Sequence, residues 1–184
     1  MRWLAWLRRS GTAEDARLRE WRQQWAQTAD APEHERARSL RDRLETIAAG
    51  VNPDDVEIER EMQDGLEAAV ELCEAMARTG PPVVLTGHRA VGSDRCHFSA
   101  PASLPDEAAQ PSGTVLLTNA RLVFVGGARA LTVPWHAVTD AARQGRDLLL
   151  IRADSGELQR VRFNSFGDAL CAHTLAGHLR RRRV

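Results

Sequence analysis

The stretch that decides the fold runs from Gly113 to Trp135 and reads G-T-V-L-L-T-N-A-R-L-V-F-V-G-G-A-R-A-L-T-V-P-W. Apolar and β-branched residues, which favour strands, fill residues 115–117, 121–125 and 131–133. Asn119 and the pair Gly126-Gly127 interrupt these runs with residues typical of tight turns. The spacing predicts three consecutive antiparallel strands, with Leu122 and Phe124 on the same face of the middle strand.

Further segments on both sides extend this pattern. Strand-like residues recur at positions 83–85, 96–102, 137–139, 147–151 and 159–163. We expect the first two segments to be the first two strands of the sheet and the last two to form a hairpin. Ser165 and Asp168 then resemble a capping box, which opens an amphipathic helix that reaches about Arg181. The second half of the chain is therefore predicted to be a β domain closed by one helix.

The order of these elements resembles the pleckstrin-homology-like superfamily, especially its GRAM and bacterial PH branches. The best-matching part is Gly113-x-Val115-x-Leu117-Thr118-Asn119-x-Arg121-Leu122-Val123-Phe124, and the resemblance spans Pro81 to Leu179. It implies a β-sandwich or partial barrel of about seven strands, capped by a C-terminal helix. It also implies a binding module, although one such scaffold serves many functions.

The first half of the chain has a different composition. Residues 1–80 carry 12 Arg and 17 Asp or Glu, a net charge of −5, whereas residues 81–184 carry 13 Arg and 8 Asp or Glu, a net charge of +5. Apolar stripes at helical spacing predict three helices between residues 12 and 79, the third opened by Asn52 and ended by Gly80. We thus expect an α+β protein with a helical region at 1–80 and the pleckstrin-homology-like domain at 81–184. The helices could pack within a monomer or between two copies.

Several classes of function find no support in the sequence. The three cysteines are widely spaced and odd in number, which favours a reducing compartment such as the cytoplasm over a disulfide framework. No apolar run is long enough for a transmembrane helix or a secretory signal. No nucleophile elbow, phosphate loop or metal-ligand spacing occurs, so we expect neither catalysis nor a cofactor or metal. The arginines at residues 180–183 suit a helix C-terminus better than nucleic-acid binding.

An anionic ligand has one candidate site in the β domain. Phosphoinositide binding, an activity that the resemblance implies, depends on basic residues at and after the first strand. The nearest basic residues are His88, Arg89 and Arg95. Asp94 adjoins Arg95 and weakens the pattern, so ordinary solvated charge is the competing interpretation.

The N-terminus is a second candidate for membrane contact. Its first nine residues make a short aromatic and basic amphipathic segment, with side chains suited to the lipid interface: Trp3, Leu4, Trp6, Leu7, Arg8 and Arg9. Packing of these side chains on the helical region is the competing interpretation.

Together these observations predict a cytoplasmic, non-enzymatic binding or scaffolding module that acts through protein–protein interaction. The surfaces to suspect are an exposed sheet edge, to which a peptide can add, and the groove beside the C-terminal helix. The alternative is peripheral attachment to an anionic membrane through the N-terminal segment and the basic surface of the β domain.

Overall fold

The computed structural model describes residues 13–127, 129–153 and 156–181. They belong to two compact units that divide between Val70 and Glu71. The helices are α1 (Ala13–Asp30), α2 (His34–Ala48), α3 (Glu57–Thr79) and α4 (Phe166–Arg181), with short 3-10 turns η2 (Pro53–Val56), η3 (Arg89–Val91) and η4 (Trp135–Ala137). The strands are β1 (Cys96–Ser103), β2 (Ser112–Thr118), β3 (Arg121–Gly126), β4 (Arg129–Pro134), β5 (Val138–Gln144), β6 (Asp147–Arg152) and β7 (Leu158–Phe163). The division predicted at residue 80 falls at the end of α3, which continues from the first unit into the second.

The first unit is a three-helix bundle held together by two buried tryptophans of α1. The indole Nε1 of Trp21 donates to the backbone oxygen of Leu40 on α2 at 2.8 Å, and that of Trp25 donates to the oxygen of Met62 on α3 at 2.8 Å. Each ring therefore adds apolar contact area and also satisfies its own polar atom. The three predicted helices are confirmed. Asn52 caps the 3-10 turn η2, which leads directly into α3, and its side chain accepts from the backbone of Asp54.

One carboxylate is buried inside this bundle. The side chain of Glu59 on α3 is only 1% exposed, and Arg22 of α1 donates its Nε to it at 2.6 Å. A buried charge is tolerated only when it is paired. The pair therefore fixes which faces of α1 and α3 meet.

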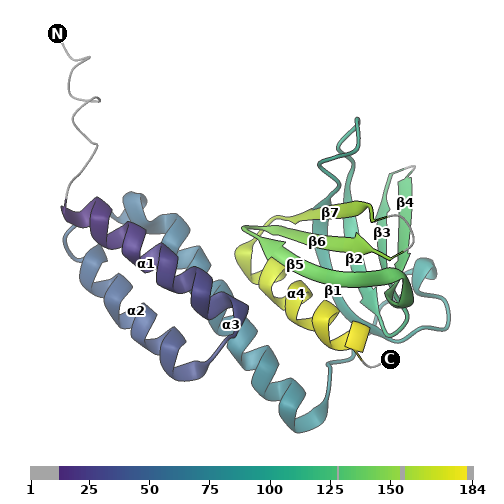
Figure 1. The fold of residues 1–184 in the computed structure, drawn as a ribbon, viewed down its shortest axis with the longest axis horizontal. Coiled ribbons are helices and arrows are strands. Elements are labelled where there is room, and N and C mark those ends of the chain that lie inside the picture. The colour runs from purple at the N-terminus through teal and green to yellow at the C-terminus, as the bar shows by residue number, and fades with distance from the viewer. Residues whose placement is uncertain (1–12, 128, 154–155, 182–184) are drawn as a thin grey trace. The chain divides into compact units, whose positions relative to one another are not determined.

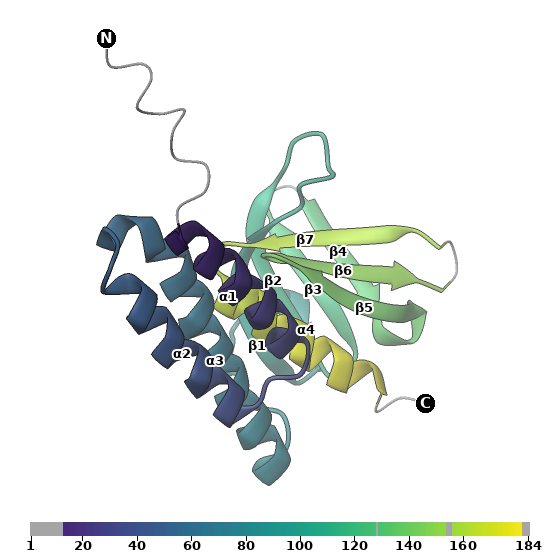
Figure 2. The same ribbon diagram turned by 60° about the vertical axis from the view of Figure 1, so that its left-hand side comes forward.

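The second unit contains a seven-stranded antiparallel sheet in the order β4-β3-β2-β1-β7-β6-β5. Two meanders, β1–β4 and β5–β7, join where Ala102 and Ser103 pair with Phe163 and Arg162. Helix α4 follows the last strand and lies against the sheet (Figures 1 and 2). Seven strands followed by one helix is the pleckstrin-homology-like order, so the predicted fold is confirmed.

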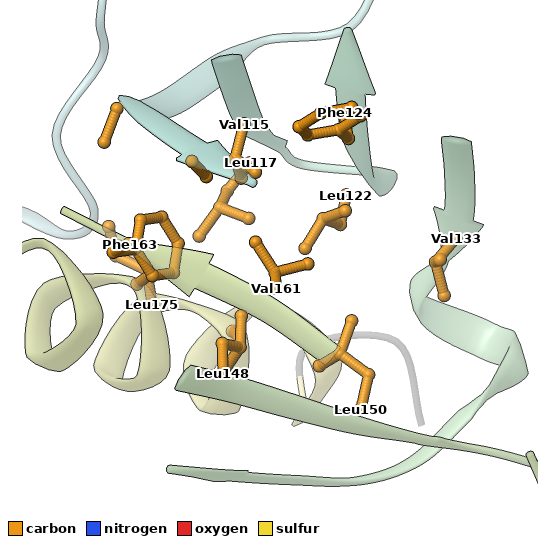
Figure 3. Close-up of a cluster of buried hydrophobic side chains, with 14 of the residues drawn as sticks. Val115, Leu117, Leu122, Phe124, Val133, Leu148, Leu150, Val161, Phe163 and Leu175 are labelled. Atoms are coloured by element: carbon orange, nitrogen blue, oxygen red, sulfur yellow. The ribbon is translucent and has the colours of Figure 1, made fainter. Parts of the chain in front are cut away.

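The core of this unit lies between the two meanders and α4. Leu122 and Phe124 point inward from β3, as their spacing predicts, into a cluster that also contains side chains from β6, β7 and α4 (Figure 3). Leu175 of α4 belongs to the same cluster. Val123, on the opposite face of β3, joins a smaller cluster on the outer side of the sheet.

Hydrogen bonds to backbone groups hold the Thr118-Asn119 pair in position. The Thr118 hydroxyl accepts from the backbone amides of Ala120 and Arg121 at 3.1 and 3.0 Å, and its carbonyl accepts from the indole of Trp135 at 2.8 Å. Thr118 is fully buried, so these bonds replace the water that its polar atoms lose. The motif thereby closes the β2–β3 turn and joins it to the end of β4.

Side chains of α4 cover the free edge of β5. Arg180 donates to the carbonyl oxygen of Thr139, and Nε2 of His173 lies 3.2 Å from that of Ala141. Ser165 caps the start of the same helix by accepting from the backbone amide of Asp168 at 3.0 Å. A peptide could add to β5 only by displacing these contacts.

The prediction of a first strand at residues 83–85 is wrong. This segment belongs to no strand of the sheet, and β1 begins only at Cys96. Its one bond to the sheet is from the backbone amide of Val84 to the oxygen of Cys96, at 2.9 Å. Three apolar residues in a row predict a strand locally, but a ladder needs a free neighbouring edge along its whole length.

Candidate functional site

The segment between α3 and β1 presents an unusual surface because only one of the three apolar residues at 83–85 faces the sheet. Val84 packs against a cluster on the outer face of the sheet that includes Val91, Leu116 and Val123. Side chains of an extended chain alternate between two sides. Val83 and Leu85 consequently face away from the sheet, with 56% and 96% of their surface exposed. A leucine so fully exposed contributes almost nothing to folding.

His88 follows these residues and caps the short turn η3. The backbone amide of Ala90 donates to His88 Nδ1 at 3.4 Å, and the amide of His88 itself donates to Thr86 Oγ1 at 3.2 Å. Because Nδ1 accepts, the proton of the neutral ring is on Nε2. The segment is thus held by its own hydrogen bonds and keeps the imidazole at the surface.

Two exposed arginines complete the cluster. Among the residues that the structure describes, neither Arg89 nor Arg95 has an ion-pair partner. The neighbouring Asp94 is bound instead to Arg121, with its Oδ2 3.0 Å from Nε. Asp94 therefore leaves the charge of Arg95 available. We call Val83, Leu85, His88, Arg89 and Arg95 the apolar–basic rim.

The rim is fixed to the sheet at its far end. The backbone amide of Arg95 donates to Asn119 Oδ1 at 2.8 Å, and the amide of Asn119 donates back to the Arg95 oxygen at 2.9 Å. All five rim residues line a groove of about 480 Å³. A second hollow, of about 440 Å³, shares Val83 and Arg95 with it and is also lined by His97.

The structure brings the three predicted basic residues, His88, Arg89 and Arg95, to one groove. That they bind an anion stays a prediction. The predicted N-terminal contact residues, 3–9, lie outside the described residues. Sequence reasoning missed Val83 and Leu85 as site residues, because it assigned them to the first strand of the sheet. Pro81-Pro82 before them and Gly87 after them bracket a run too short for a paired strand, and this signal could have identified them.

The described part of the chain offers little support for metal binding, for nucleophilic cysteines or for a membrane-spanning helix. No group of three metal-ligating side chains gathers within residues 13–127, 129–153 and 156–181. Burial raises the pKa of all three thiols, those of Cys73, Cys96 and Cys171, and that of Cys171 reaches about 11. Raised values keep these thiols protonated, which makes them poor nucleophiles. None of the described helices combines the length and the apolar character that crossing a bilayer requires.

Comparisons with known proteins add structural likeness only. No established sequence family matches the chain, and no curated protein sequence matches it. The Vps36 N-terminal PH domain is 15% identical, with a TM-score of 0.44, over 55% of this chain and 92% of that one. The C-terminal domain of an unknown protein from Leishmania infantum is 10% identical, with a TM-score of 0.43, over 49% of this chain and 88% of the other.

A longer match reaches a chain in the crystal structure of human RhoA with the DH/PH fragment of PDZRHOGEF. It is 16% identical, with a TM-score of 0.43, over 92% of this chain and 54% of that one. This chain thus spans about half of that longer chain. Assignment to the GRAM or bacterial PH branch stays a prediction.

Proposed function

We propose that this protein is a non-enzymatic binding module that attaches reversibly to anionic membrane surfaces through the apolar–basic rim. The observation that carries the proposal is the exposure of Leu85 beside two arginines that have no ion-pair partner among the described residues. Apolar side chains flanked by arginines suit the boundary between headgroups and acyl chains. Covering of the β5 edge by α4 disfavours peptide addition at that edge of the sheet.

The expected strength follows from the residues of the rim. Complete burial of an exposed leucine or valine is worth about 1.5 to 3 kcal/mol, and each arginine near an anionic surface adds about 1 kcal/mol. Val83 starts half-buried and contributes less than Leu85. The sum is on the order of 5 kcal/mol, which is weak, reversible binding. Salt should weaken it further, because the arginines are exposed.

Co-sedimentation with vesicles tests the proposal. The full chain is mixed with vesicles of phosphatidylcholine alone and with vesicles that also contain phosphatidylserine, at low and at high salt. We expect binding to the anionic vesicles only, and weaker binding at high salt. Leu85→Ser should reduce the affinity by about 2 kcal/mol, or about thirtyfold.

Matched variants separate the rim from general effects. Ile58 is 58% exposed on α3 and lies outside the rim, so Ile58→Ser should leave vesicle binding unchanged. Arg38 is exposed on α2, and Arg38→Glu is the corresponding control for Arg89→Glu. A chain lacking residues 1–9 measures the N-terminal segment separately. If neither Leu85→Ser nor Arg89→Glu changes the vesicle affinity of the full chain, the proposal that the rim binds the membrane is refuted. A chain that binds neither vesicle would direct the search to an acidic protein partner.

A further inference from the structure

Two more exposed apolar side chains lie on the hairpin of β6 and β7. Ile151 and Leu158 face each other directly across the two strands, and 38% and 51% of their surfaces are exposed. Leu150 and Val161 of the same strands point into the core. Since side chains alternate along a strand, Ile151 and Leu158 lie on the outer face. We call them the hairpin pair.

A series of backbone hydrogen bonds joins the hairpin pair to the apolar–basic rim. The amide of Ala153 donates to Ala137 on η4 at 2.8 Å, and the amide of Trp135 donates to Ala120 at 3.1 Å. Asn119, next along the chain, is bonded to Arg95 of the rim. Hydrogen-bonded backbones lie about 5 Å apart, so these links place the turn of the hairpin and Arg95 at the same end of the β domain.

The two described carboxylates beside the hairpin pair, those of Glu157 and Asp140, both have interaction partners. Asp140, which pairs with Ile151 across β5 and β6, is bound to Arg180 with 3.3 Å between its Oδ1 and Nη2. The exposed His136 lies on η4, between the hairpin and the rim. A carboxylate that already has a cationic partner repels an anionic membrane less than a free one.

We infer that the hairpin pair is a second membrane contact, which enters the same anionic bilayer as the apolar–basic rim. This inference rests on the proposed function, because the rim supplies the charge that selects the surface. Two weak contacts on one rigid unit bind together far more tightly than either alone, since the second contact forms at high effective concentration. A contact as weak as the rim gains most from such a partner.

The experiment measures anionic-vesicle affinity for the full chain and for Leu158→Ser, Leu85→Ser and the control Ile58→Ser. About half of the Leu158 surface is already buried, so we expect Leu158→Ser to weaken binding about fivefold and to leave its salt dependence unchanged. Leu158→Trp should strengthen binding, because indole rings favour the membrane interface. The gain-of-function variant keeps the test decisive if the serine variant folds poorly.

The outcomes separate the two proposals. If Leu85→Ser weakens binding and neither Leu158 variant changes it, the hairpin contact is refuted and the rim stands. If no variant affects binding, both are refuted. If Leu158→Ser instead converts a dimer to a monomer in sedimentation velocity without changing vesicle affinity, the hairpin pair covers a second copy of this chain, and the membrane contact is refuted.

Discussion

Replacing Gly113 with alanine should separate β2 from β3 at the start of the fold-deciding stretch. A Cβ at this position would lie 2.2 Å from the backbone oxygen of Val125 and 2.5 Å from the Cα of Gly126. Both atoms belong to the backbone, so no side-chain rotation can relieve the overlap. Overpacking typically costs about 1 to 3 kcal/mol. Because strand pairing is disturbed as well, we expect about 3 kcal/mol for Gly113→Ala.

Urea denaturation followed by circular dichroism at 218 nm measures this loss. Gly87→Ala is the matched control: its Cβ would meet nothing within 4 Å, and its backbone is not in the left-handed region. We expect it to change the free energy of unfolding by less than about 0.5 kcal/mol. Equal stability of the two variants would refute the close approach of β2 and β3.

Three further predictions concern stability. The chain has no lysine and no tyrosine, so cysteines are the side chains that titrate between pH 9 and 11. Burial raises the pKa of Cys171 from 9.0 to about 11, so the folded state keeps the thiol proton to a higher pH than the unfolded state does. The associated stability is present below pH 9 and is lost as the pH rises through 11, by at most about 3 kcal/mol. The free energy of unfolding from urea denaturation should therefore vary less across this pH range for Cys171→Ala. Arg22→Ala leaves the buried carboxylate of Glu59 unpaired and should cost about 3 kcal/mol, whereas Arg22→Met combined with Glu59→Leu should recover most of that loss; equal losses in the two variants would contradict the buried pair. Ser165→Ala removes the α4 cap and should cost about 1 kcal/mol in the same assay, and an unchanged midpoint would mean that the cap is dispensable.

The order of helices and strands follows from local patterns that the structure retains. Turn residues at Asn119 and Gly126-Gly127 separate β2, β3 and β4 where the sequence predicts them. Inward-facing Leu122 and Phe124 keep the spacing of a strand with one buried face. Residues 83–85 show the limit of this reasoning, because whether an apolar run pairs depends on an edge far away in the sequence.

The candidate site could be predicted only in part for the same reason. Proximity in sequence identified His88, Arg89 and Arg95, but it also made Asp94 look like the counter-charge of Arg95. In the structure that carboxylate binds Arg121, the first residue of β3. Leu85 is exposed because Val84 packs against the sheet instead. Which of two adjacent apolar residues faces the sheet is decided by tertiary packing and not by the local sequence.

The contacts of α4 with β5 have a consequence for self-association. Open strand edges recruit strands from other molecules and so lead to aggregates. Arg180 and His173 contact two backbone carbonyl oxygens on that edge. The helix therefore hinders the addition of strands from other molecules, which fibril growth requires. Detachment of α4 alone would uncover this template while the sheet stayed intact. Turbidity on heating should therefore begin below the temperature at which the sheet melts, and begin earlier in Arg180→Ala.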